Sequence, residues 1–241
     1  MRIGKTGLAW ALVVTAFSFT PVLRCGELQP FSARFGVTWH GLSAGESRVE
    51  LQRLPDGRWS YSSRNEPRGL FRLAMPKELS SRSVFSIRDG KLVPERFTGD
   101  DGTEATKRDS DLQFDWARGR VTGIAETRKV DLPLQPGMLD SMSVQVALMH
   151  ELLEGRTPTH FVMVDKDKVK EYLYTAQGSE TLQTVLGSRR TLLFRSARAG
   201  SDSGTWFWCA PDLGYLPLKV ERRTGSKVEW SMTLLHATVA D

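Results

Sequence analysis

The stretch FSARFGVTWHGLSAGE, residues 31–46, decides the fold class of this chain. Apolar side chains recur at every second position, and the residues between them are small, polar or charged. A period of two over this length predicts a half-buried β-strand. The glycines of GLSAGE predict a tight corner where that strand ends. The apolar face consists of Phe31, Ala33, Phe35, Val37 and Trp39.

The same alternation continues along the chain to residue 239. Turn signals interrupt it at Asp56-Gly57, Asp89-Gly90, Arg118-Gly119 and Thr224-Gly225, because glycine accepts the positive φ that tight turns require. Residues 160–178 and 180–196 are each predicted to form a hairpin, with turns at Asp165–Lys168 and at Gly187, so that Gly178 ends the first of them. About fourteen short strands at near-regular spacing are typical of a sandwich, a barrel or a spiralling sheet. No linker breaks the series, so residues 27–241 are predicted to form a single β-rich domain.

Residues 139–155, LDSMSVQVALMHELLEG, follow a helical pattern instead. Their apolar positions Met142, Val146, Met149, Leu152 and Leu153 form one stripe of a helix. Asp140 or Ser141 suits its start and Gly155 its end. We expect this amphipathic helix to pack in the concave side of a curved antiparallel sheet of many strands, an open barrel or β-spiral.

The first 26 residues predict export. Arg2 and Lys5 precede an apolar run, residues 8–19, and Pro21 follows it, which is the order of a secretory signal peptide. We therefore expect a periplasmic protein that lacks residues 1–26. The stretch VLRCG resembles a lipobox only loosely, since Arg24 stands where a small residue is needed, so a lipid anchor at Cys25 is the less favoured outcome.

Removal of this segment changes the charge. It holds three cations and no acid, so the formal charge of +5 becomes +2. That balance gives no support to nucleic-acid binding, which needs a clustered basic surface. Cys209 is left alone if Cys25 is removed, and an oxidising compartment allows the two to pair if it is kept. The favoured interpretation of Cys209 is a small buried residue in a strand.

No motif in the chain predicts catalysis, a metal or a cofactor. His150-Glu151-x-x-Glu154 lacks the second histidine of a zinc protease, so a solvated helix face is the better interpretation. Asp202 occupies the place of serine in GSDSG, residues 200–204, which excludes a nucleophile elbow. The acidic pairs Asp109/Asp111 and Asp165/Asp167 sit in polar or turn-like contexts. The histidines do not occur at the spacing of metal ligands: His40, His150, His160 and His236.

One irregular stretch, EPRGLFRLAMPKEL at residues 66–79, combines apolar and basic residues between two prolines. It is either a loop that packs back on the core or an apolar lip with a basic rim, at the mouth of a cavity or on a membrane. A ligand with an acyl tail and an anionic head fits the second interpretation. The candidate ligand-binding residues are Phe35, Val37, Trp39, Leu70, Phe71 and Met75, with Arg68, Arg72 and Lys77 as the cations.

Four ordered stretches carry a family resemblance. FGVTWHGLSAGE, DSMSVQVAL, ETLQTVLG and WFWCAPDLGYLPLKVE together resemble the exported bacterial proteins known as domain of unknown function 3108. The resemblance implies a periplasmic or envelope-associated β domain and brings no catalytic residues. The chain departs from the pattern at Cys209, where an aliphatic residue is usual. More loosely, a sheet around one helix looks like the half-open barrels of periplasmic lipoprotein carriers and envelope-integrity proteins.

Two functional hypotheses follow. The favoured one is a non-catalytic envelope module whose concavity holds an acyl chain, a lipoprotein segment or an envelope protein partner. The alternative is an envelope enzyme of the glycan hydrolase type, with a carboxylate site assembled from residues distant in sequence. The two differ in whether acids such as Asp140 and Asp212 converge in a cleft, or whether the cleft is lined by Phe, Leu and Trp.

Overall fold

The computed structural model describes residues 26–103 and 109–240. The predicted signal peptide and Cys25 therefore lie outside the described residues, apart from Gly26. One antiparallel sheet of 14 strands forms the fold, in the order β8-β7-β6-β5-β4-β3-β2-β1-β14-β13-β12-β11-β10-β9. The expectation of a curved, many-stranded antiparallel sheet is confirmed.

Short turns join most neighbouring strands. The strands are β1 (Phe31–Trp39), β2 (Leu42–Arg53), β3 (Trp59–Pro67), β4 (Leu79–Arg88), β5 (Lys91–Asp100), β6 (Ser110–Asp115), β7 (Arg120–Ala125), β8 (Arg128–Pro133), β9 (His160–Asp165), β10 (Lys168–Thr184), β11 (Gly187–Ala197), β12 (Ser203–Ala210), β13 (Leu216–Thr224) and β14 (Lys227–Val239). The helical elements are α1 (Phe71–Ala74), α2 (Ser143–Leu153) and the 3-10 turn η2 (Pro211–Leu213). Helix α1 lies between β3 and β4, and α2 between β8 and β9.

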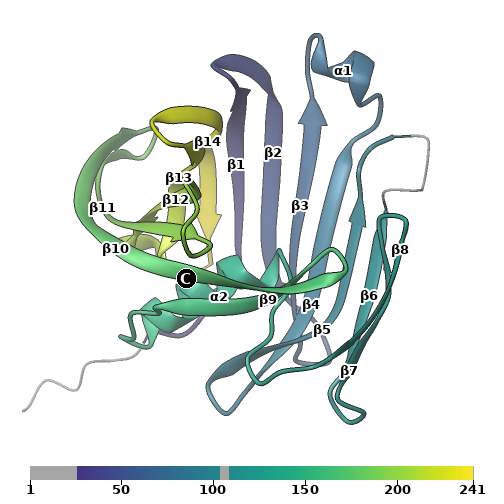
Figure 1. Ribbon diagram of the computed structural model, residues 1–241. Coiled ribbons are helices and arrows are strands. Elements are labelled where there is room, and N and C mark those ends of the chain that lie inside the picture. The colour runs from purple at the N-terminus through teal and green to yellow at the C-terminus, as the bar shows by residue number, and fades with distance from the viewer. Residues whose placement is uncertain (1–25, 104–108, 241) are drawn as a thin grey trace, which may run out of the picture.

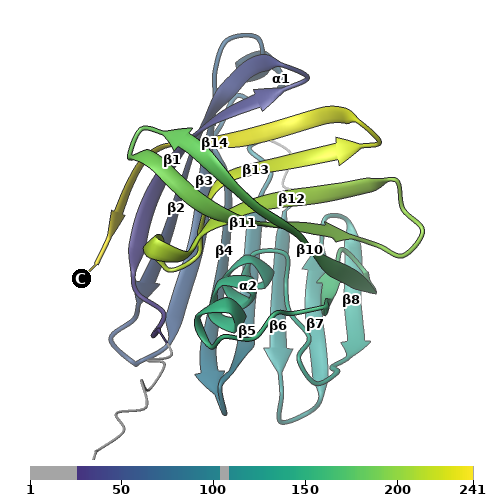
Figure 2. The ribbon, with the colours of Figure 1, turned by 90° about the vertical axis from the view of Figure 1, so that its left-hand side faces the viewer.

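The sheet curls around α2. Figures 1 and 2 show β10–β14 facing β3–β8 across the hollow in which α2 lies. The main core fills this hollow, and it includes Phe35 from β1, Phe85 from β4, Leu148 from α2 and Phe194 from β11. Helix α2 is therefore packed in the concave side of the sheet, as predicted.

The two ends of the sheet, β8 and β9, meet at a seam. Leu139, just before α2, bridges in parallel to Met163 of β9. The ion pairs Arg128–Asp167 and Lys166–Glu126 also cross the seam, each at 2.8 Å. A second apolar cluster lies beneath them and includes Val130 and Val164. The sheet is open in its hydrogen bonding, yet side chains hold its edges together.

Helix α2 begins and ends as its caps predict. Oδ1 of Asp140 accepts the backbone N–H groups of Met142 and Ser143, each over 2.8 Å. The Asp140 N–H in turn donates to Oγ of Ser143 over 2.9 Å. Gly155 follows the helix with φ of +72°, the conformation in which helices commonly stop.

The prediction of a solvated face on α2 is wrong for His150. Its side chain is buried, and Nε2 donates to the Gly90 carbonyl in the β4–β5 turn over 3.1 Å. Glu151 and Glu154 do pair at the surface with Arg156. The turn at Gly90 covers the helix on a side that faces solvent in a simple amphipathic helix, and its carbonyl is the partner of Nε2. Nδ1 of the same ring is buried without a hydrogen-bond partner among the described residues.

Two predicted strand boundaries are also wrong. The corner after β1 is made by His40 and Gly41, with φ of +47° and +81°, and LSAGE already belongs to β2. Two consecutive positive φ values form the hairpin turn whose twist matches its flanking strands. At Gly178 the register shifts within one long strand, β10, between Ala176 and Ser179, so this glycine marks a bulge and not a break.

Candidate functional site

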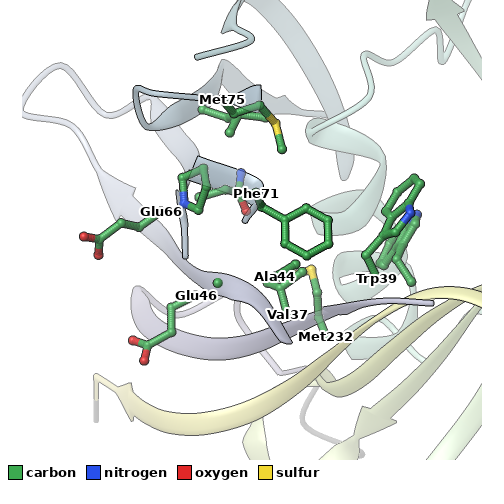
Figure 3. A pocket seen from close by; sticks show the side chains of 13 residues that line it. Val37, Trp39, Ala44, Glu46, Glu66, Phe71, Met75 and Met232 are labelled. Carbon is green, nitrogen blue, oxygen red and sulfur yellow. The ribbon is translucent and has the colours of Figure 1, made fainter. Parts of the chain in front are cut away.

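An apolar pocket of about 510 Å³ opens at one end of the concave face. Its walls come from β1, β2, β3, β14 and the start of β4, and the segment around α1 covers it (Figures 1 and 3). The lining residues are Val37, Trp39, Ala44, Gly45, Glu46, Asn65, Glu66, Pro67, Phe71, Met75, Leu79, Trp230 and Met232. This volume lies within the range of about 300–1,000 Å³ that small-molecule sites occupy.

Register between β1 and β14 builds one wall of the pocket. Trp39 pairs with Trp230, Val37 with Met232, and Phe35 with Leu234. Directly opposed residues share a face of the sheet, so these pairs form a continuous apolar strip. Phe35 and Leu234 are buried in the core, whereas Trp39 is 47% exposed. The strip therefore runs from the packed core to the open end of the pocket.

A bulge in β2 shapes the floor. Gly45 has φ of +150°, and a Cβ at this position would lie 2.1 Å from the Glu66 carbonyl oxygen. The pairing of β1 with β2 shifts register here, between Val37 and Thr38. Only glycine allows β2 and β3 to approach this closely.

The flap, which we define as residues 69–76, covers the pocket and contains α1. The neighbouring backbone anchors it at both ends, since the Arg68 N–H donates to the Ala44 carbonyl and the Lys77 N–H to the Gly102 carbonyl. Figure 3 shows the Phe71 ring pointing into the pocket, with Met75 beside it. Leu70 and Leu73 are 79% and 84% exposed. The flap thus divides its apolar side chains between the pocket and the outside.

The carboxylates near the pocket turn away from it. Figure 3 shows the side chains of Glu46 and Glu66 directed away from the cavity. Oε1 of Glu46 forms an ion pair with Nη1 of Arg68, which lies 3.0 Å away. The lining that remains on the inside is mostly apolar, which suits a hydrocarbon chain.

The sequence-predicted site residues fall into two groups. Val37, Trp39, Phe71 and Met75 line the pocket. The others do not: Phe35 is in the core, Leu70 and Arg72 are exposed outside, and Arg68 pairs with Glu46. Sequence reasoning missed Trp230, Met232 and Leu79. The alternation of β14 places Trp230 and Met232 on one face, but the pairing of the first strand with the last is what brings them to Trp39.

Asp140 and Asp212 do not converge. Asp140 is 1% exposed and is occupied by the start of α2 and by Ser83, whose Oγ donates to Oδ2 over 2.6 Å. Burial raises the pKa of Asp140, while the bonds from Ser83, Ser143 and Met142 oppose that rise. Asp212 is exposed in η2 and lies 3.5 Å from Arg189. Within the described residues, the pair forms no shared cleft.

The other candidate reactive groups are buried in the core or bonded to neighbouring residues. Cys209 is fully buried in the core, as predicted, and burial raises the pKa of its thiol. Asp111 pairs with Arg96 at 2.7 Å, and Asp165 accepts bonds from Lys170 and Tyr172. Carboxylates of Asp100, Asp101 and Asp109 lie within 4.8 Å of one another. Two of them accept backbone N–H groups of their own turn, at Gly102 and Thr103.

Comparison with known proteins identifies the family. The family model described as "Protein of unknown function (DUF3108)" matches residues 34–228, and the chain belongs to this family. No curated protein matches the sequence. In the described ranges, 26–103 and 109–240, no helix has both the length and the apolar character needed to span a membrane.

Solved structures show the fold. A β-barrel-like protein of domain of unknown function DUF1849 from Brucella abortus has a TM-score of 0.57 at 11% identity, over 90% of this chain and 100% of that one. MucB has a TM-score of 0.38 at 12% identity, over 88% of this chain and 54% of its own. The MucA/MucB complex of Pseudomonas aeruginosa has a TM-score of 0.42 at 10% identity, over 91% of this chain and 55% of that one. The chain thus spans about half the length of these last two. The similarity to the DUF1849 protein shows a shared fold, and the two similarities to MucB add nothing to that conclusion.

Proposed function

We propose that this DUF3108 domain is a non-catalytic module of the bacterial periplasm that holds an acyl chain in the apolar pocket under the flap. One observation carries the proposal: the cavity is lined by Trp39, Phe71, Met75, Trp230 and Met232, while the carboxylates beside it turn outward. A hydrocarbon chain gains free energy on leaving water for such a site. A polar substrate finds few groups there to replace its hydration.

The place of the pocket supports a binding role. It lies where the apolar strip leaves the packed core, so a chain that enters it extends an existing apolar surface. The flap is joined to the wall by backbone bonds at its ends and by the side chains of Phe71 and Met75. A short segment with few tethers opens at low cost compared with the core, which gives a ligand a way in.

Two sources of the acyl chain fit the pocket equally. A free lipid presents its own tail, and a lipoprotein segment presents the tails on its modified N-terminus. Both keep a polar or charged group outside, near the exposed cations Arg72 and Lys77. The alternative of a glycan hydrolase is less well supported, because Asp140 caps a helix in the core and Asp212 sits apart from it.

The test is ligand capture by protein purified without detergent. Native mass spectrometry and organic extraction should reveal a co-purifying acyl compound, and a fluorescent fatty-acid probe should gain intensity on binding. The double variant Phe71→Ser/Met75→Ser should lose both signals.

Leu70→Ser/Leu73→Ser is the matched control. It removes the same kind of apolar bulk from the same flap, but on the outward side, so binding of the soluble fatty-acid probe should persist. An apo mass together with no probe binding by the unaltered protein contradicts the proposal. An acyl group attached to a co-purifying peptide identifies the lipoprotein source, and a free lipid identifies the other.

A further inference from the structure

The open end of the pocket carries an unusual set of exposed apolar side chains, which we call the apolar rim. Its members are Trp39, Leu42, Leu70 and Leu73, with exposed fractions of 47%, 64%, 79% and 84%. Single exposed leucines are ordinary on protein surfaces, but several grouped at one place mark a surface that meets an apolar partner.

The rim comes from two segments that are distant in sequence. Trp39 and Leu42 flank the turn between β1 and β2, and Leu70 and Leu73 lie on the flap. Figures 1 and 2 show this turn and α1 at the same end of the sheet. Trp39 and Phe71 also line the pocket between them. The rim therefore surrounds the place where the pocket opens.

Cations accompany the rim. Residues 68–77, RGLFRLAMPK, contain three cations and no acid. Arg68 is paired with Glu46. Arg72 and Lys77 are exposed, and no carboxylate in the described part of the chain makes an ion pair with either. Glu66 and Glu78 flank this stretch and are also exposed, and Glu78 lies 3.9 Å from Arg64. The stretch itself thus combines apolar side chains with the positive charges of Arg72 and Lys77.

We propose that the apolar rim docks on the surface of an anionic phospholipid bilayer. Leu42, Leu70 and Leu73 enter the boundary between headgroups and acyl chains, and Arg72 and Lys77 contact the lipid phosphates. Trp39 takes the level of the headgroups, where indole rings are enriched because one part is apolar and the N–H is polar.

The form of the surface favours a bilayer over a protein partner. Leu42 and Leu70/Leu73 project from the ends of separate elements, and the hollow between them is the pocket itself. A folded partner needs a continuous, complementary patch of roughly 800 Å² on each side. A fluid bilayer adapts to separate projecting side chains and supplies the negative charge that matches Arg72 and Lys77.

Docking deepens the proposed function, on which this consequence rests. With the rim in the bilayer, the pocket faces the acyl region directly. An acyl chain then moves between bilayer and pocket without crossing water, so the barrier from exposing its hydrocarbon surface is avoided. The inward Phe71 and Met75 are the first groups that it meets.

The test is flotation of the purified protein with vesicles of phosphatidylethanolamine and phosphatidylglycerol, compared with vesicles of phosphatidylcholine alone. Leu70→Ser/Leu73→Ser should weaken binding to the anionic vesicles by about tenfold or more, because two apolar side chains no longer enter the bilayer. Arg72→Gln/Lys77→Gln should weaken it at low salt and matter less at high salt.

The control changes exposed apolar residues elsewhere. Ile124 and Val185 are 56% and 61% exposed, and Ile124→Ser/Val185→Ser should bind vesicles as the unaltered protein does. All variants carry the same N-terminal segment, so its own affinity for lipid cancels in the comparison. Unchanged flotation of Leu70→Ser/Leu73→Ser overturns the proposal, as does equal binding of the unaltered protein to neutral and anionic vesicles.

The soluble fatty-acid probe separates this proposal from the proposed function. Phe71→Ser/Met75→Ser should lose the probe and still float with vesicles. Leu70→Ser/Leu73→Ser should keep the probe and lose the vesicles. Loss of flotation in both double variants, with matching losses of thermal stability, indicates a damaged flap and overturns the docking assignment.

Discussion

Ser83 on β4 donates its hydroxyl hydrogen to Oδ2 of Asp140 over 2.6 Å, and so joins the sheet to the start of α2. The other carboxylate oxygen of Asp140 accepts two backbone N–H groups of the helix. This buried carboxylate fixes the position of the helix within the concavity. The cost of burying it is offset only while all three donors are present.

Replacing Ser83 with Ala should therefore lower the free energy of unfolding by about 1.5–3 kcal/mol near neutral pH, the usual value of a hydrogen bond to a charged group. Urea midpoints measure the effect. Ser81→Ala, on the same face of β4 but outside this network, is the control and should cost less. Equal losses for the two variants contradict a special role for Ser83.

The same substitution has a predictable pH dependence. Burial raises the pKa of Asp140 in the folded protein above its ordinary value of 3.8. Ionisation of Asp140 thus reduces stability as the pH rises through its folded-state pKa, because the unfolded chain holds its proton less tightly. Loss of the Ser83 donor raises that pKa further, so Ser83→Ala should destabilise more at about pH 7 than at about pH 4. Urea midpoints that shift equally at both values contradict this.

Helix α2 provides a test of the core. Met149 and Leu152 are 2% and 6% exposed, and truncation of either to Ala should cost about 2–5 kcal/mol, because a cavity replaces packed atoms. Glu154 pairs with Arg156 at the surface, and Glu154→Ala should cost no more than about 0.5 kcal/mol. Denaturant midpoints measure these losses. Similar losses for the buried and the exposed residues would mean that the helix is not packed as described.

Gly45 permits a test of the bulge under the pocket. Ala at this position meets the Glu66 carbonyl and an unfavourable φ, so Gly45→Ala should destabilise by about 1–3 kcal/mol or more. Gly41 also has positive φ, but a Cβ there would meet no atom within 4 Å. Gly41→Ala is therefore the control for φ alone. The difference between the two thermal midpoints measures the steric contact, and no difference excludes it.

The seam between β8 and β9 should loosen at low pH. A hydrogen bond from Arg128 is the main cause that lowers the pKa of Asp167. This contribution to stability is present above the ordinary carboxyl pKa and is lost as the pH falls through the lower, folded-state value. Arg128→Ala should remove this dependence and speed hydrogen exchange at the Val164 N–H, which donates to Leu139.

Arg120→Ala is the matched control for the seam. It breaks an ion pair of the same kind, with Asp131, between β7 and β8 on one side of the seam. Exchange at Val164 should stay slow in this variant. Fast exchange in both variants, or in neither, shows that the Arg128–Asp167 pair does not hold the edges together.

Export is tested by the N-terminus of the protein in cells. The order of charged, apolar and proline residues in the first 26 positions predicts cleavage. N-terminal sequencing of protein from the envelope fraction should therefore begin between about Pro21 and Glu27. Full-length protein in the cytoplasm argues against export.

Much of the fold follows from local pattern, because period-two alternation and glycine turns depend on neighbouring residues. That is why strands such as β1 and the helix caps at Asp140 and Gly155 could be predicted. The roles of Gly45 and Gly178 were harder to predict. Glycine permits a positive φ at both positions, but whether it makes a turn or a bulge depends on the partner strand.

Only part of the pocket could be predicted from the sequence. Val37, Trp39, Phe71 and Met75 stand out because they are apolar in alternating or cation-rich surroundings. Trp230 and Met232 join them only through the pairing of β1 with β14, which is a contact between the two ends of the chain. The burial of His150 was not predicted for a similar reason, since the Gly90 carbonyl that its Nε2 contacts belongs to a turn that is distant in sequence.

The pairing of β1 with β14 also has a consequence for biosynthesis. The ribosome makes β1 early and β14 last, yet the two lie side by side in the middle of the sheet, and the Ala240 N–H donates to the Pro30 carbonyl. Until β14 is made, one side of β1 presents unpaired backbone groups that invite association with other chains. Loss of the thirteen residues of β14 would therefore deprive both β1 and β13 of a neighbour. A nascent chain that stops short of β14 should be a substrate for chaperones and proteases.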